Sequence, residues 1–258
     1  MAGLAERVGW EPEIRIYRDS RDLFVATAEC LTSFLEASLS ERRSSSFVLT
    51  GGSTPRPVYD LLSDSPLRKR IDWARLHLFW GDERCVPPDH PDSNFRMVRE
   101  ILLSKLPVPD GCFHRIQAES EDPAKAARLY EGEIQRVVTD APVPSFDLVI
   151  LGMGEDGHTA SLFPGTRWDE DRLVAANYVP RLDSWRITMT PRLLNAARRM
   201  VFLASGQSKA TALAGVLEGP AGVYPAQRIH PASGSLIWMV DKAAASLLHE
   251  SRQRALYF

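Results

Sequence analysis

The chain has 258 residues and a mass of 28.8 kDa, enough for one large or two small domains with a sizeable buried core. Apolar residues make up 44% of it and charged residues 25%, which excludes a disordered, collagen-like or coiled-coil protein. The net charge is −2, from 31 basic and 33 acidic residues, so no overall positive field favours nucleic acid or an anionic membrane as a partner. Any anionic ligand must be bound by local groups.

The cysteines and the N-terminal residues indicate a cytoplasmic protein. Cys30, Cys85 and Cys112 are odd in number and form no CxxC pair, which argues against a disulfide framework and a zinc knuckle. Charged residues are spread through the first 15 positions, so we expect no signal peptide. We also expect no membrane span, because no apolar run approaches the ~18 residues that one requires.

Short apolar runs alternate with longer segments of helical period, a pattern that predicts an α/β fold. We expect a Rossmann-like, mostly parallel central sheet flanked by helices, with a small additional lobe or lid, in a single domain over residues 1–258. The predicted strands are Ile14–Tyr17, Phe47–Thr50, Leu76–Trp80, Phe146–Leu151, Met200–Ala204 and Leu236–Val240. The predicted helices are Asp19–Arg42, one that starts at Pro57, Asn94–Leu106, Pro123–Thr139 and Ser208–Leu217.

Ligands of open α/β sheets bind beyond the carboxyl ends of the strands, so the residues after each predicted strand carry most information. The second strand is followed by Gly51, Gly52, Ser53, Thr54 and Pro55. The glycines permit a tight turn, the hydroxyls can donate hydrogen bonds, and the proline can start a helix whose first amides attract an anion. A phosphate site and an ordinary capped turn both fit this segment. A Walker loop does not, because no GK[ST] follows.

The third strand is followed by Asp82, Glu83 and Arg84. Such a cluster can supply a positioned carboxylate and a guanidinium that stabilises negative charge. The alternative is a solvated surface ion-pair cluster. Its place at a strand end favours a functional role.

The fourth strand is followed by a glycine-rich turn that contains Asp156 and His158. Although it matches GxGxxG, a dinucleotide site is rejected, because Glu155 and Asp156 would lie beside a pyrophosphate and Pro164 would end the helix early. A histidine presented by such a turn suits a general base, although a structural histidine is the alternative. The sequence has neither a GxSxG elbow nor an HExxH motif, so we predict no covalent intermediate and no metal.

Six segments in order give the chain a close resemblance to the 6-phosphogluconolactonases, within the wider sugar-phosphate isomerase and deaminase superfamily. They are TGGSTP at Thr50–Pro55, WGDERCVP at Trp80–Pro87, SNFRM at Ser93–Met97, LGMGEDGHTASLFP at Leu151–Pro164, WRITMTP at Trp185–Pro191 and SGQSKA at Ser205–Ala210. Together they extend over much of the chain, and six ordered segments are far more specific than any one of them.

The resemblance implies hydrolysis of 6-phospho-D-glucono-1,5-lactone to 6-phosphogluconate, in the oxidative pentose phosphate pathway, without a cofactor or metal. It implies that His158 is the general base on water, that Asp156 orients the imidazole or the water, and that Arg84 stabilises developing charge or grips the substrate. Asp82 would contact sugar hydroxyls. The implied phosphate-binding residues are Gly51, Gly52, Ser53, Thr54, Arg186 and Lys209, together with Arg181, which stands where the family commonly has a lysine and whose role stays open.

Three alternatives to lactone hydrolysis remain. In glucosamine-6-phosphate deaminases the segment after the histidine ends in a glutamate, whereas Thr159–Pro164 contains no carboxylate, which favours hydrolysis. A non-catalytic sugar-phosphate sensor would keep the phosphate loop, and a nicotinamide-dependent dehydrogenase is the least supported. For the lactonase we expect a sugar-phosphate substrate, no nucleic-acid or membrane partner, and a monomer or weak oligomer.

Overall fold

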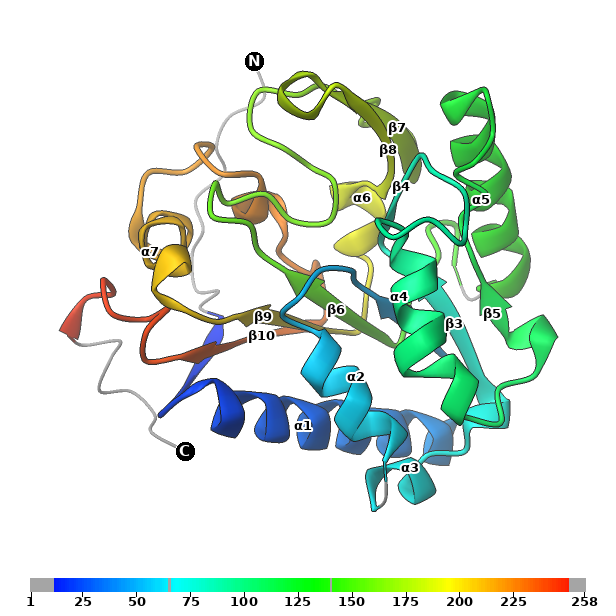
Figure 1. The fold of residues 1–258 in the computed structure, drawn as a ribbon, viewed down its shortest axis with the longest axis horizontal. Helices are drawn as coiled ribbons and strands as arrows, with labels where there is room; N and C mark the ends of the chain where they lie inside the picture. Colours follow the sequence, from blue (N-terminus) through cyan, green and yellow to red (C-terminus); the bar gives the residue numbers. More distant parts are fainter. Residues whose placement is uncertain (1–11, 65, 140, 251–258) are drawn as a thin grey trace.

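The computed structural model describes residues 12–64, 66–139 and 141–250. Seven strands form the central sheet in the order β1-β10-β9-β6-β2-β3-β5, and all neighbouring pairs are parallel (Figure 1). This confirms the predicted α/β fold with a mostly parallel sheet. The strands are β1 Glu13–Tyr17, β2 Ser45–Leu49, β3 Leu76–Trp80, β5 Phe113–His114, β6 Leu148–Gly152, β9 Arg199–Ala204 and β10 Ser235–Asp241.

All six predicted strands are present, with no end displaced by more than two residues, and Leu76–Trp80 matches at both ends. The structure adds the edge strand β5, whose two residues are too few to produce a sequence pattern. Most strand residues are buried, as expected for a sheet that is covered on both faces.

The helices are α1 Ser20–Glu41, α2 Arg56–Ser63, α3 Leu67–Arg70, α4 Asn94–Ile101, α5 Pro123–Val137, α6 Pro191–Leu194 and α7 Ala210–Glu218. Three predicted helix ends differ from the structure by two residues or more; one is the end of α5, which lies at Val137 instead of Thr139. Helix α4 stops at Ile101, short of Leu106: Leu103–Lys105 form a 3-10 turn, and Pro107 disfavours helical backbone at Leu106, which is extended. Helix α7 starts at Ala210 because the preceding Gln207–Lys209 also forms a 3-10 turn.

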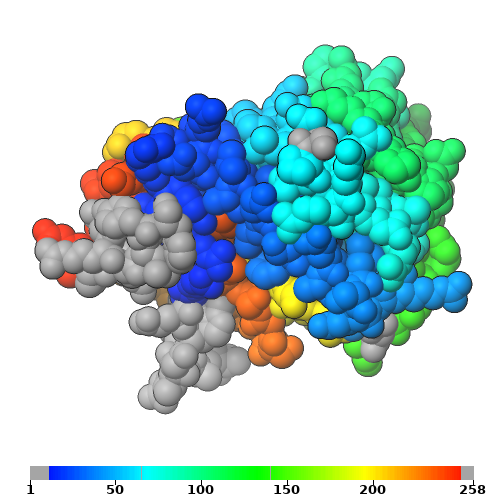
Figure 2. Space-filling view, turned by 90° about the horizontal axis from the view of Figure 1, so that it is seen from below, coloured from blue at the N-terminus to red at the C-terminus, as the bar shows by residue number. Residues whose placement is uncertain are grey.

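Helix α1 extends along one side of the sheet beside α2 (Figure 1). Its N-cap is Asp19, whose carboxylate accepts a hydrogen bond from the amide of Asp22 at 3.0 Å. Of the described helices, only α1 is long and apolar enough to cross a membrane. Its residues Leu23, Leu31 and Leu35 are completely buried in the hydrophobic core, so core packing explains this composition. Figure 2 shows that the N-terminal part of the chain, in blue and cyan, covers much of this face.

A second, antiparallel sheet forms the small lobe that was expected. It has the order β4-β8-β7, with β4 at Asp82–Arg84, β7 at Val174–Val179 and β8 at Ser184–Met189. These three strands were not predicted. Helix α5 packs against β7 and β8, and apolar residues of both strands join the core of the central sheet. The lobe therefore stands over the carboxyl ends of the central strands (Figure 1).

Candidate active site

A pocket lies at the carboxyl ends of β2, β3 and β6, where three of the predicted polar segments meet. The residues that line it are Thr50, Gly51, Gly52, Ser53, Thr54, Pro55, Asp82, Arg84, Asn94, Gly152, Met153, Gly154, His158, Ala160 and Lys209. Eight of these lining residues are among the eleven site residues that the sequence predicted. The remaining three predicted site residues, Asp156, Arg181 and Arg186, do not line the pocket.

The loop after β2 forms one wall of the pocket and leads into α2. Thr50 is fixed at its start, because its amide donates to the hydroxyl of buried Tyr59 and its carbonyl accepts from the same hydroxyl, both at 2.9 Å. In the described structure no side chain caps the N-terminus of α2, which follows Pro55. The first amides of α2 are therefore available to an anion, together with the hydroxyls of Ser53 and Thr54.

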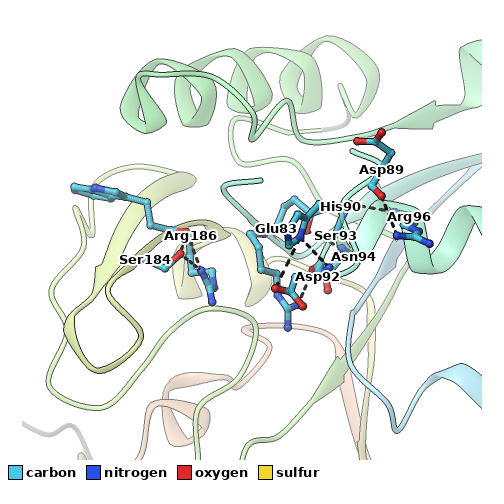
Figure 3. A network of polar contacts seen from close by, with 11 residues as sticks. Glu83, Asp89, His90, Asp92, Ser93, Asn94, Arg96, Ser184 and Arg186 are labelled. Carbon is cyan, nitrogen blue, oxygen red and sulfur yellow. Dashed lines mark hydrogen bonds and ion pairs between the residues drawn. The ribbon is translucent and has the colours of Figure 1, made fainter. Parts of the chain in front are cut away.

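Strand β4 divides the acidic cluster between the pocket and the protein interior. Asp82 and Arg84 line the pocket, whereas Glu83 points the other way, as alternation along a strand requires. The buried Glu83 carboxylate accepts hydrogen bonds from the amide of Asn94 at 2.7 Å and from the hydroxyl of Ser93 at 3.0 Å (Figure 3). It also accepts one from the amide of Phe95 at 2.8 Å. Burial raises the pKa of Glu83 even though these donors favour its ionised form. Glu83 is thus a structural anchor for the start of α4.

Asn94 is a pocket residue to which we assigned no role from the sequence. Its amide nitrogen donates to the carbonyl of Asp82 at 3.0 Å, and the Ser161 hydroxyl donates to the Asp82 carboxylate at 2.6 Å. Asp82 is therefore held from two sides. One sequence signal could have pointed to Asn94. Ser93 is a good N-cap residue, and a capping serine places the next residue in the first turn of a helix.

The turn after β6 holds His158 and Asp156 together. Nδ1 of His158 lies 2.5 Å from Oδ1 of Asp156, and Oδ1 also accepts from the amide of His158 at 3.2 Å. A Cβ on Gly154 would lie only 2.0 Å from Nδ1 of His158, so a glycine is required there. Burial raises the pKa of Asp156, but contact with His158 and the charge of Arg181 outweigh it and hold that pKa well below its ordinary value. The histidine leaves Nε2 available to a water or a substrate.

The predicted cations occupy three different positions. Lys209 lines the same pocket as the loop after β2. Arg186 on β8 faces Arg84 on β4 in the strand register, and burial, followed by the charge of Arg84, lowers its pKa. Its Nη1 donates to the hydroxyl of Ser184 at 2.6 Å (Figure 3). Arg181 contacts Asp156 instead of the pocket, with Nη2 at 2.5 Å from Oδ2.

A buried carboxylate outside every recognised motif supports Lys209. Asp241, at the end of β10, accepts from the Ser205 hydroxyl at 2.5 Å and from the Gly206 amide at 3.0 Å. Gly206 has a φ of +93°, which favours glycine. Asp241 therefore fixes the turn that leads into Lys209. The sequence did not predict this role, because Asp241 is a single polar residue at a strand end and belongs to no motif.

Known proteins resemble this chain in sequence and in fold. The family model described as glucosamine-6-phosphate isomerases/6-phosphogluconolactonase matches residues 18–238. The chain belongs to this family. A 6-phosphogluconolactonase of Synechocystis sp. is 38% identical over 92% of this chain and 98% of the relative, and one of Haemophilus influenzae is 40% identical over 78% and 86%. The solved structure of the 6-phosphogluconolactonase from Trypanosoma cruzi has a TM-score of 0.84 at 29% identity, and covers 94% of this chain and 98% of that one.

The family that the six sequence segments suggested is confirmed. Within the described residues, no group of three or more His, Cys, Asp or Glu side chains is placed to hold a metal ion, and all three cysteines are free. The glycines after β6 lead into a turn closed by a bridge between Thr159 and Leu162. A helix does not follow there, so this turn differs from the strand-to-helix connection of a dinucleotide site.

Proposed function

We propose that this protein hydrolyses 6-phospho-D-glucono-1,5-lactone to 6-phospho-D-gluconate, with His158 as the general base. The observation that carries the proposal is a histidine in the pocket wall whose Nδ1 is fixed by Asp156, opposite a loop suited to phosphate. The chain's relatives are named 6-phosphogluconolactonases, which supports the same substrate.

In the proposed reaction, Nε2 of His158 takes a proton from a water whose oxygen attacks the lactone carbonyl. Asp156 holds the imidazole in place and stabilises the imidazolium that forms. The Arg84 guanidinium stabilises the negative charge on the carbonyl oxygen. When the tetrahedral intermediate collapses, the ring C–O bond breaks and the proton passes to the departing ring oxygen, which restores neutral histidine.

The phosphate end of the substrate would lie against Gly51, Gly52, Ser53 and Thr54. A phosphate ester carries about −1.5 to −2 charges at neutral pH. Backbone amides, two hydroxyls and the ammonium of Lys209 line this part of the pocket and can balance that charge locally. Arg186, opposite Arg84 on the neighbouring strand, adds positive charge at longer range. This local arrangement accommodates an anion in a protein whose net charge is −2.

The test is proton release from freshly prepared 6-phosphogluconolactone, corrected for spontaneous opening and performed with a metal chelator present. We expect wild type to accelerate hydrolysis and His158→Ala to lose about 10² or more in kcat. His230→Ala is the matched control, because that histidine is exposed and outside the pocket, and it should retain full activity. No acceleration by wild type would refute the proposal.

Two further measurements address the alternatives. The mass of enzyme quenched in acid during turnover should be unchanged, since water attacks the substrate directly and no acyl-enzyme forms. Glucosamine 6-phosphate should not be deaminated. The description of the matching family model also names glucosamine-6-phosphate isomerases, but the segment after His158 presents the ring of Phe163, 4.2 Å from the imidazole, and no carboxylate. Release of ammonia from glucosamine 6-phosphate would favour the deaminase instead.

A further inference from the structure

Arg181 reaches the Asp156–His158 pair from the small lobe. The two carboxylate oxygens of Asp156 are divided between two partners: Oδ1 lies 2.5 Å from Nδ1 of His158, and Oδ2 lies 2.5 Å from Nη2 of Arg181. The carboxylate cannot rotate toward one partner without losing contact with the other. Arg181 therefore restricts the same group that orients the histidine.

An aromatic ring provides a second connection between the arginine and the histidine. The Arg181 guanidinium lies 4.9 Å from the centre of the Phe163 ring, and that ring lies 4.2 Å from the imidazole of His158. Phe163 is buried, so a cation against its face forms a favourable contact. Arg181, Asp156, His158 and Phe163 thus form a closed ring of contacts.

The backbone that carries Arg181 is well defined even though its side chain is 53% exposed. It belongs to the turn Pro180–Leu182 that joins β7 to β8. Pro180 fixes its own φ, and its carbonyl accepts from the amide of Asp183 at 3.1 Å. The Tyr178 hydroxyl also donates to the carboxylate of Asp183, across the turn. The guanidinium is therefore presented from a constrained hairpin.

The position of Arg181 relative to the pocket distinguishes two possible roles. Among the described residues that line the pocket are His158, Lys209 and the phosphate loop, but neither Asp156 nor Arg181. Lys209 already supplies a cation at the phosphate end, whereas Arg181 lies behind Asp156. We propose that Arg181 is a positioning residue for the catalytic histidine and that it is not a phosphate ligand. This proposal rests on the proposed function.

The positive charge of Arg181 acts on His158 as well, through the carboxylate of Asp156 that both residues contact. A carboxylate without a compensating cation favours a protonated imidazole, and a protonated imidazole cannot act as a base. Arg181 offsets the charge of Asp156. The other charged groups that face the histidine across the pocket are Asp82, Arg84 and Lys209, and none of them contacts Asp156 in the described structure.

The test compares Arg181→Gln, Arg181→Lys and the control Arg228→Gln. Arg228 makes the same two kinds of contact, an ion pair with Glu170 at 2.9 Å and a stack on Trp168 at 5.2 Å, but lies outside the pocket. We expect Arg181→Gln to lower kcat roughly 10- to 100-fold while KM changes less than about threefold. The acidic limb of its pH profile should move to higher pH. Arg181→Lys keeps the charge and should retain most activity, and the control should match wild type.

A substrate without phosphate separates positioning from phosphate binding. Glucono-1,5-lactone should show the same fold loss in Arg181→Gln as the phosphorylated lactone does, because the histidine is affected in both reactions. A rise in KM confined to the phosphorylated substrate would make Arg181 a phosphate ligand and overturn the proposal. Unchanged kinetics with both substrates would overturn it too.

A spectroscopic readout keeps this proposal independent of the proposed reaction. In ¹⁵N-histidine-labelled protein without substrate, we expect His158 of wild type to carry its proton on Nδ1 near neutral pH, and Arg181→Gln to change the populations of its protonation states. An identical His158 spectrum in both proteins would overturn the proposal. If wild type hydrolyses no lactone, the proposed function fails, while the spectrum still shows whether Arg181 acts on the histidine.

Discussion

Gly51 and Asn94 lie so close together that a Cβ on Gly51 would be 1.8 Å from Oδ1 of Asn94. The contact joins the loop after β2 (Gly51–Pro55), where we propose that the phosphate binds and which we call the phosphate loop, to the first residue of α4. Asn94 in turn donates to the carbonyl of Asp82. One asparagine therefore sets the spacing between the phosphate loop and the carboxylate that we expect to contact the sugar.

We predict that Gly51→Ala destabilises the protein by about 1–3 kcal/mol and lowers kcat/KM, because either the loop or Asn94 must move. The double variant Gly51→Ala, Asn94→Ala should lose less stability than the sum of the single variants, since the second change removes the clashing atoms. Urea denaturation measures all three. Gly132→Ala is the control: that glycine is on helix α5 with open space around it, and the change should be neutral or stabilising. Strict additivity would contradict the proposed clash.

Glu83→Gln should destabilise the fold by about 1–3 kcal/mol. An amide has one oxygen where the carboxylate has two, so it leaves the amide of Asn94 or Phe95 without its buried acceptor. The midpoint of urea denaturation should fall while the slope stays constant. Glu100→Gln, on the helix α4 that Glu83 anchors, alters only an exposed pair with Arg96 and should change stability by less than about 0.5 kcal/mol. Equal effects of the two changes would argue against the buried anchor.

Periodicity predicted the central sheet well because its strands are apolar over consecutive residues and its helices are long. It did not predict β4, β7 and β8, because these strands mix polar and apolar residues and β4 has only three. Strand-end clusters identified Asp82, Arg84 and His158 as site candidates, since parallel strands bring their carboxyl ends to one edge. The partners of Arg181 could not be predicted, because a hairpin turn brings it to Asp156 from a different sheet.

Asp241→Asn should weaken substrate binding more than it slows chemistry. The carboxylate of Asp241 has two oxygens that accept from the Ser205 hydroxyl and the Gly206 amide. An asparagine keeps one of these oxygens and replaces the other with an NH₂ group, which cannot accept a hydrogen bond. The turn before Lys209 loosens as a result. We expect KM to rise about tenfold, corresponding to roughly 1.4 kcal/mol, with a smaller change in kcat. Asp60→Asn, in an exposed pair with Lys105, serves as the control and should leave KM unchanged. A KM equal to that of wild type would show that Asp241 does not support Lys209.

Asp156→Asn should reveal the depressed pKa of this carboxyl through the pH dependence of stability. Because the folded-state pKa of Asp156 lies below its unfolded value of about 4, the ionised group stabilises the fold above that pH, and the contribution disappears as the pH falls through the folded-state value. The difference in unfolding free energy between wild type and variant should therefore be about 1 kcal/mol at pH 7 for this partly exposed pair, and should shrink below pH 4. Urea denaturation at pH 7, 5 and 3.5 measures it. The exposed Asp169 provides a matched control, since Asp169→Asn should give a small difference at every pH. A difference for Asp156→Asn that grew between pH 5 and pH 3.5 would mean that the carboxyl is not stabilised in its ionised form.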